Sequence, residues 1–424
     1  MREKRAVSRE WILGFLCVAF ARGLVFRIPY LRSIFYDPMI VEFGLSHTQI
    51  GMMLSVYSTV KTILYIPCGI LGDRLGTRKT LTFSTGLMAA LTLWYSFNPS
   101  YAGLLIIHGV FGIAVNFAVP AMIKALRYFG GKDAQGRAFG FAETCRGVAS
   151  LAINFVALWI YQSMSGLSSP MRPVLMIHAG VYAFLAFAAW KTCPDTEIDD
   201  NGNRIKPPGL KDYIKVMKMP VVWLLTFMVM SSYCLEILNE YTTPYMTYAL
   251  GMSAVTAGVM ASIRSYAISL ATGPVFGIIN DRYKSYSKTI KYVSVLQMVV
   301  GIGLVVLPAE PRYCWIGMIF IVLGAIGVDG FASTQFCTFE ECSIPVELTG
   351  TVTTIVSTLG YTPDIWLTPM IGRYLDSNSS PEAYRHVFML IILFAGISIV
   401  LAHFVGKLAR KNRALAESQG QKDG

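Results

Sequence analysis

Long apolar stretches alternate with short polar turns along almost the whole chain. The hydrocarbon core of a bilayer is about 30 Å thick and needs roughly 20 apolar residues per helix, and about twelve stretches reach that length. The pattern predicts an all-α membrane protein with twelve transmembrane helices. We expect them at residues 11–36, 48–71, 79–97, 102–126, 138–161, 173–191, 220–246, 254–279, 289–308, 313–336, 349–372 and 384–408.

A polar segment in the middle of the chain divides these helices into two sets of six. We expect an N-terminal bundle over 1–192, a cytoplasmic linker over 193–219, a C-terminal bundle over 220–409 and a cytoplasmic tail over 410–424. Gly-Leu-Ser at 44–46 recurs as Gly-Met-Ser at 251–253, an offset of about 207 residues. An even number of helices per repeat returns the chain to the same side, so the two bundles have the same orientation and are pseudo-symmetric.

Composition and charge agree with a membrane protein. Hydrophobic residues make up 54% of the chain and charged residues only 14%, against about 25% in soluble proteins, which excludes an ordinary cytosolic enzyme. The net charge of +11 lies mainly in alternate loops, whereas residues 38–47, 97–102 and 243–252 contain no Lys or Arg. The positive-inside rule therefore predicts that both termini are cytoplasmic, with no nucleic-acid partner. We expect a multi-pass protein of the bacterial inner membrane.

The strongest local signal lies between the second and third predicted helices. Residues 69–79 read Gly-Ile-Leu-Gly-Asp-Arg-Leu-Gly-Thr-Arg-Lys. This segment resembles the loop motif G-x-L-x-D-R-x-G-x-R-K of the major facilitator superfamily at every defining position. The resemblance implies that family's fold and a loop that stabilises one transporter state through charge contacts. The implied conformational-switch residues are Gly69, Asp73, Arg74, Gly76 and Arg78, with Asp281 and Arg282 from a partly retained second copy.

The first predicted helix carries several basic residues at membrane depth, where a charge is costly and usually functional. At about 100° per residue, Ala19, Gly23, Phe26 and Tyr30 share a face that we assign to the transport cavity. Arg22 lies about 60° and Arg27 about 80° from the centre of that face. We expect both arginines to contact substrate or a gate, with a structural ion pair as the alternative. Arg32, about 140° away, is expected to extend to the outer interface.

Further polar residues at membrane depth complete the candidate site. In the first half they are Lys61, His108 and Asn116, the last two on the expected cavity face of the fourth helix with Gly112. In the second half Tyr233, Glu236 and Glu240 share one stripe of the seventh helix, and Arg264 lies in the eighth. We expect Glu236 or Glu240 to pair with Arg22 or Arg27 as a latch between the halves. The candidates for proton coupling are Glu236, Glu240, Asp329 and Asp364; Asp329 and Asp364 have pairing with Arg264 as the alternative.

These features predict a secondary active transporter that works by alternating access. Basic residues in helices one, two and eight favour a small organic anion, carboxylate-like or zwitterionic, because guanidinium and ammonium groups bind carboxylates. The expected partners are this substrate, the lipid bilayer and a proton or counter-ion, and the protein is expected to be a monomer. Transport of an uncharged sugar or a cationic drug, or a non-transporting membrane sensor, remain alternatives. We expect no enzymatic activity, metal or cofactor, because no catalytic or ligand motif is found.

Overall fold

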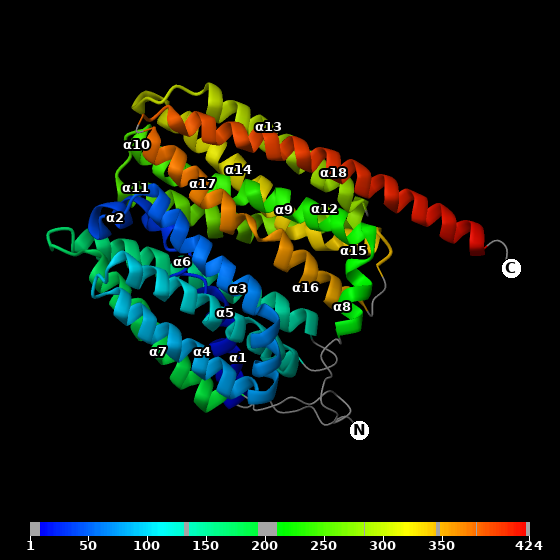
Figure 1. Cartoon of the computed structure of the whole chain (residues 1–424), viewed down its shortest axis with the longest axis horizontal. Helices are drawn as coiled ribbons and strands as arrows, with labels where there is room; N and C mark the ends of the chain where they lie inside the picture. Colours follow the sequence, from blue (N-terminus) through cyan, green and yellow to red (C-terminus); the bar gives the residue numbers. More distant parts are fainter. Residues whose placement is uncertain are drawn as a thin grey trace. The chain divides into compact units, whose positions relative to one another are not determined.

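The part of the chain that the structure describes consists of helices joined by short turns (Figure 1). The computed structural model describes residues 9–130, 135–193, 210–283, 285–344, 348–378 and 380–420. The chain divides into two compact units, Met1–Pro207 and Pro208–Gly424.

The first unit contains seven described helices in sequence. They are α1 (Arg9–Leu24), α2 (Arg32–Phe43), α3 (His47–Leu75), α4 (Thr77–Tyr95), α5 (Tyr101–Gly130), α6 (Gln135–Ser163) and α7 (Met171–Thr192). Helix α5 packs between α3 and α4, α4 also packs on α7, and α1 packs on α6, α7 and α5. Ser46 caps α3, since its hydroxyl accepts a hydrogen bond from the Gln49 amide and the Gln49 side chain accepts one from the Ser46 amide.

The second unit is built mainly from long helices that pack in pairs. The described elements are α8 (Leu210–Met217), α9 (Pro220–Glu240), α10 (Thr242–Tyr248), α11 (Ala254–Ser262), a π-helix (Ile263–Ala267), α12 (Ile268–Tyr283), α13 (Tyr286–Val306), a 3₁₀ turn (Pro311–Tyr313), α14 (Cys314–Thr334), a 3₁₀ turn (Gln335–Cys337), α15 (Thr338–Glu341), α16 (Thr349–Gly360), α17 (Pro363–Ser377) and α18 (Ala383–Gly420). Helix α13 packs along α18 and on α14, α9 packs on α18 and α16, and α12 packs on α14.

Each predicted transmembrane stretch is occupied by one helix or by consecutive helices, so the predicted fold class is confirmed. Within the described residues, eight helical segments are long and apolar enough to cross a membrane on length and composition alone. The other four predicted stretches correspond to α1 with α2, to α3, to α4, and to α16 with α17. Two of these four are interrupted by a break in the helix, which shortens the continuous apolar run.

A proline stands at each of the three breaks. A proline ring clashes with the carbonyl of the residue four positions earlier and supplies no amide hydrogen for it. In a continuous helix, the ring of Pro29 would clash with the carbonyl of residue 25, and α1 ends just before that residue. The ring of Pro244 would clash in the same way with the carbonyl of Glu240, the last residue of α9. Pro363 begins α17 directly after the turn that ends α16. The sequence predicts continuous helices at 11–36, 220–246 and 349–372, whereas the structure shows two helical pieces in each.

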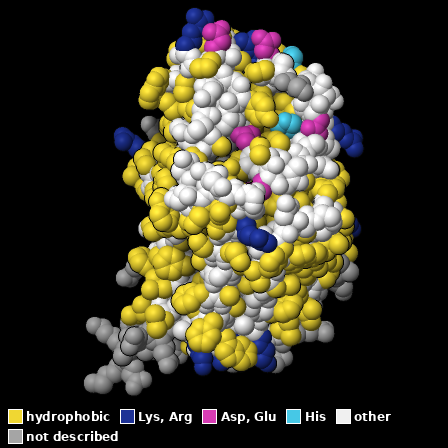
Figure 2. All heavy atoms as spheres, turned by 90° about the vertical axis from the view of Figure 1, so that its left-hand side faces the viewer, with side chains coloured by type: hydrophobic (Ala, Val, Ile, Leu, Met, Phe, Trp, Pro, Cys, Tyr) yellow, Lys and Arg dark blue, Asp and Glu magenta, His cyan; other side chains and the backbone are white. Residues whose placement is uncertain are grey.

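Large hydrophobic side chains are exposed on both units. Trp159, Phe184 and Trp315 are each more than two-thirds exposed. On the face drawn in Figure 2, hydrophobic side chains cover much of the surface and charged side chains are few and scattered. A water-soluble protein rarely exposes so much apolar area, whereas lipid contact requires it. The chain is therefore an integral multi-pass membrane protein.

Candidate functional site

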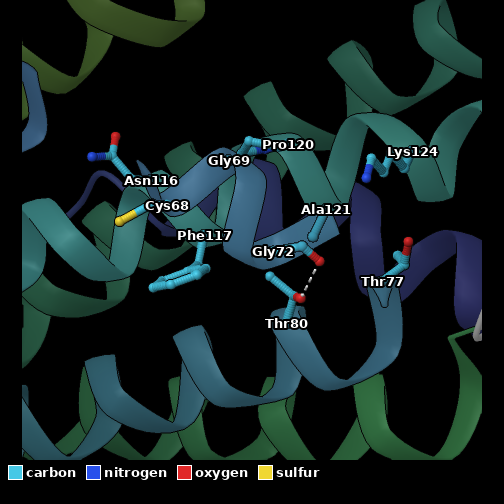
Figure 3. Close-up of a pocket in the computed structure, with 10 residues that line it drawn as sticks. All are labelled: Cys68, Gly69, Gly72, Thr77, Thr80, Asn116, Phe117, Pro120, Ala121 and Lys124. Atoms are coloured by element: carbon cyan, nitrogen blue, oxygen red, sulfur yellow. Dashed lines mark hydrogen bonds between the residues drawn. The ribbon is translucent and has the colours of Figure 1, made fainter. Parts of the chain in front are cut away.

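The predicted switch loop forms the tight turn between α3 and α4. Gly76 has φ 84°, a left-handed backbone conformation that favours glycine, which explains this glycine of the motif. The Thr80 hydroxyl donates to the Gly72 carbonyl over 3.1 Å, beside a small pocket that Phe117 of α5 helps to line (Figure 3). The Arg78 Nε donates to the Cys193 carbonyl over 2.7 Å and so joins the turn to the end of α7.

The other predicted switch residues are less informative. Gly69 lies on α3, and a Cβ at this position would have nothing within 4 Å, so a side chain there meets open space. Arg282 is exposed in the last turn of α12. The side chains of Asp73, Arg74 and Asp281 lie outside the described residues, so the role assigned to them stays a prediction.

A basic and aromatic group joins the turn after α1 to helix α3. The Lys61 Nζ lies 5.4 Å from the centroid of the Tyr57 ring, a cation–π distance. The Tyr57 ring meets Tyr30 edge to face at 5.7 Å, and Tyr30 in turn meets Phe26 at 6.5 Å. Arg22 lies in the last turn of α1, four residues before Phe26. The structure thus brings together Tyr30 and Lys61 and adds Tyr57, which sequence reasoning missed because nothing in its local pattern marks it.

The end of α1 is held by the neighbouring helices. Carbonyls in the last turn of a helix have no partner within that helix. Ser150 of α6 donates to the Gly23 carbonyl over 3.0 Å, and Tyr182 of α7 donates to the Leu24 carbonyl over 2.7 Å. Arg27 lies in the turn that follows α1. Ser150 and Tyr182 therefore supply hydrogen-bond donors to two backbone carbonyls at the end of α1.

Three interpretations of the first predicted helix need correction. A Cβ on Gly23 would lie 2.7 Å from the Arg146 carbonyl, so this position of the assigned cavity face packs tightly on α6. The helical wheel also assumed a continuous helix, whereas residues 25–31 form a turn. Arg32 is only 4% exposed and does not extend to the outer interface.

The polar stripe of α5 packs against neighbouring helices. Asn116 Nδ2 donates to the Lys61 carbonyl over 2.8 Å, and a Cβ on Gly112 would lie 2.7 Å from the Tyr57 carbonyl. These contacts hold α5 close to α3. His108 is 2% exposed, bonds through Nδ1 to the Leu104 carbonyl and lies against the Tyr95 ring. This stripe, which the helical wheel assigns to the cavity, thus contributes to packing within the unit.

An open acidic cavity of about 90 Å³ lies between helices of the second unit. At roughly 30 Å³ per water molecule, this is room for about three waters or a small ion. Its walls come from α9, the π-helix and α14. The charged and polar side chains that line it belong to Glu236, Asn239, Glu240, Arg264, Ser265 and Asp329. The structure thus brings together four of the predicted residues and adds Asn239 and Ser265.

Arg264 connects this cavity to the break in the seventh predicted helix. Its Nη1 donates to the Asn239 carbonyl over 2.7 Å and to the Thr242 hydroxyl over 2.6 Å, with a longer contact of 3.4 Å to the Thr243 hydroxyl. The side chain is 5% exposed, and its Nη2 has no hydrogen-bond partner among the described residues. The π-helix that carries Arg264 is a local distortion of the kind often found at functional sites.

The two remaining acidic candidates have separate partners. Asp329 accepts hydrogen bonds from Ser269 over 2.6 Å and from Thr272 over 2.8 Å, both on α12. Asp364 is fully buried in the first turn of α17 and accepts a hydrogen bond from Tyr233 over 2.7 Å. The positive end of the helix dipole favours a carboxylate there. Tyr233 and Asp364, placed apart in our prediction, form one pair.

Comparison with known proteins identifies the family. The family described as Major Facilitator Superfamily matches residues 11–363. The chain belongs to the major facilitator superfamily. Membrane transport is therefore the function class of this major facilitator superfamily protein, and the resemblance seen in the loop motif is confirmed.

Relatives of this major facilitator superfamily protein share nearly its whole length. Inner membrane protein YqcE of Escherichia coli is 28% identical over 403 residues, covering 92% of this chain and 93% of the relative. Inner membrane protein YihN of the same organism is 25% identical over 425 residues, covering 97% and 99%. The Escherichia coli protein named Probable galactarate/D-glucarate transporter GudP is 20% identical over 434 residues, covering 94% and 93%.

A solved structure has the same fold. It is a bacterial homolog of the human lysosomal transporter Spinster in an inward-facing and unoccupied conformation, with a TM-score of 0.74. The match covers 96% of this chain and 98% of that chain at 13% identity. At this identity the likeness concerns the fold alone.

Proposed function

We propose that this protein is a secondary active transporter of a small organic anion that works by alternating access. The observation that carries the proposal is the basic and aromatic group of the first unit, in which the Lys61 ammonium lies over the Tyr57 ring. Arg22 and Arg27 add positive charge to the same unit at membrane depth. The name of the relative GudP, whose two named sugar acids are dicarboxylates, supports the same class of substrate.

The proposal assigns proton coupling to the second unit. Carboxylates within the membrane are the groups that usually carry protons in transporters, and Glu236, Glu240 and Asp329 line one cavity. Asp364, paired with Tyr233, is the fourth candidate. The latch between the arginines of the first predicted helix and the glutamates of α9 belongs to this proposal, together with a monomeric state.

The proposal also includes the orientation of the chain. Both termini are cytoplasmic by the distribution of Lys and Arg. The names of YqcE and YihN, both inner membrane proteins, support location in the bacterial inner membrane.

A cationic substrate is the second candidate, and the acidic cavity favours it. Three carboxylates against one guanidinium would attract a small cation. In that case the arginines and Lys61 of the first unit only neutralise the negative charge of the acidic residues.

Uptake into proteoliposomes separates the two candidates. The purified protein is tested with labelled galactarate, a sulfonate, a sugar and an organic cation, with and without an inward proton gradient. We expect saturable uptake of an anion that the gradient accelerates. Lys61→Gln should reduce anion uptake at least tenfold, because one charge-assisted contact is worth about 1.5–3 kcal/mol. Lys191→Gln, an exposed lysine at the end of α7, is the matched control. Uptake of the cation alone would refute the proposal.

A further inference from the structure

Two adjoining surface hollows lie at the end of the second unit where α13 begins. The first has a volume of about 580 Å³ and lies between α13, α15 and the C-terminal half of α18. The second has a volume of about 520 Å³ and lies between α12 and α13. Ser285 and Lys288 line both hollows, so the two adjoin at the start of α13. The described residues that line them include none of the candidate transport residues.

The first hollow is strongly basic. Lys288 and Lys291 of α13 and His403 and Arg410 of α18 line it, and all four side chains are exposed. Among the described residues that line it, Glu341 is the one acid.

The carboxylate of Glu341 is already engaged. It is 6% exposed and accepts hydrogen bonds from the Ser287 amide over 2.7 Å and from the Ser287 hydroxyl over 2.9 Å. Those bonds lie at the start of α13, where the helix dipole further offsets the negative charge. Both carboxylate oxygens of Glu341 are thus bonded to Ser287, and the basic side chains of the hollow are exposed.

Packing holds the walls of the first hollow in place. A Cβ on Gly406 would lie 2.8 Å from the Ser287 Oγ, so α18 passes very close to the start of α13. Two turns further along, the Ser294 hydroxyl donates to the Ser398 hydroxyl over 3.0 Å. Close packing therefore fixes α13 and α18 relative to each other, and with them the backbone positions of the basic residues.

The second hollow is mainly apolar and leads onto a lipid-facing surface. Phe276 and Ile279 of α12 and Tyr292 and Val293 of α13 form its walls. Tyr292 is 72% exposed and begins an exposed apolar stripe along α13, repeated every three or four residues. The rest of the stripe consists of Val295, Val299, Ile302 and Val306.

We propose that the paired hollows bind one anionic phospholipid. Its phosphate lies in the first hollow with Lys288, Lys291 and Arg410, and one acyl chain lies on the stripe that begins at Tyr292. Basic pockets between transmembrane helices attract anionic headgroups, and an apolar surface one helical turn away accepts the chain. A free phosphate would use the basic hollow alone and leave the apolar hollow without a function.

Native mass spectrometry of the full chain in a neutral detergent tests this proposal. Phosphatidylglycerol is titrated against phosphatidylcholine with the same acyl chains. We expect one phosphatidylglycerol to bind in preference to phosphatidylcholine, and about 10 mM inorganic phosphate to leave it bound. Each lysine near an anionic headgroup contributes about fivefold to binding, so the double variant K288Q/K291Q should bind phosphatidylglycerol about thirtyfold more weakly.

The matched control is Lys407→Gln, which removes an exposed charge from the same end of α18 but does not line either hollow. It should bind phosphatidylglycerol like the unaltered protein. The variant K288R/K291R keeps both charges and should also retain binding, which separates charge from misfolding. Equal binding of the two lipids, unchanged binding by K288Q/K291Q, or displacement of the lipid by inorganic phosphate would each overturn the proposal.

Discussion

Arg264 offers the sharpest test of how the second unit works. The substitution Arg264→Gln removes the two short hydrogen bonds of Nη1 to the Asn239 carbonyl and the Thr242 hydroxyl. Bonds that involve a charged group are each worth about 1.5–3 kcal/mol. The Asn239 carbonyl keeps one partner, because the Thr242 hydroxyl donates to it over 2.6 Å.

The substitution also relieves the cost of a buried charge, which opposes the loss of these bonds. We therefore expect the free energy of unfolding to fall by about 1–3 kcal/mol, less than the sum of the two bonds. For a unit of this size, that corresponds to a thermal midpoint lower by about 3–10 °C. The measurement is thermal unfolding of the purified protein without substrate.

The same experiment distinguishes an anchor from a substrate ligand. If Arg264 holds the bend between α9 and α10, Arg264→Gln lowers stability without substrate, and Arg264→Lys, which keeps the charge, restores part of it. Thr243→Ala, which loses only the 3.4 Å contact, should change the midpoint by less than about 2 °C. If Arg264 is only a substrate ligand, Arg264→Gln weakens substrate binding while the midpoint without substrate stays unchanged. That second result would refute the anchoring role.

Three further predictions follow from single contacts. Gly76→Ala should destabilise the protein by about 1–2 kcal/mol, because alanine is strained at φ 84°, and thermal unfolding measures the loss. Tyr233→Phe should cost about 1–3 kcal/mol in the same assay, because it removes a donor to the fully buried Asp364. Burial and the neighbouring Glu341 charge raise the pKa of Cys342 to about 12, so its thiolate is scarce at pH 8. Maleimide should label Cys342 more than a hundredfold more slowly in the folded than in the unfolded chain, with the rate rising about tenfold per pH unit.

Each of these predictions has its own control. Gly69→Ala lies in open space within α3 and should leave stability unchanged or raise it, so a loss equal to that of Gly76→Ala would contradict the backbone explanation. Tyr361→Phe loses only a 3.4 Å bond from Gln335, and it should cost less than Tyr233→Phe. Rapid labelling of Cys342 at pH 7 in folded protein would contradict its burial.

Much of the architecture was predictable because membrane helices leave a strong signal. A span needs a long apolar run, and every predicted run is occupied by helix. The loop motif at 69–79 indicated the family before any comparison, since its glycines and charges meet the needs of a tight turn. The break after Glu240 was also readable in principle, because Pro244 stands four residues further on.

The candidate site was less predictable, because a helical wheel describes one helix at a time. Periodicity put Glu236 and Glu240 on one stripe of α9, and both line the same cavity. The same reasoning assigned Gly23 to the transport cavity, whereas it packs against α6. A helical wheel gives the angle between two side chains around one helix. It does not show which neighbouring helix packs against either side chain.

What the sequence alone determined, then, is the number of apolar stretches, their repeat and the family, since these depend on local composition and spacing. Only the tertiary structure decided that Arg264 bonds across to Asn239, that Tyr233 bonds to Asp364 131 residues away, and that Glu341 caps α13 beside a basic hollow. Such pairs depend on how helices pack and where they break. A buried polar group takes its hydrogen-bond partner from whichever helix end or side chain the packing brings near it.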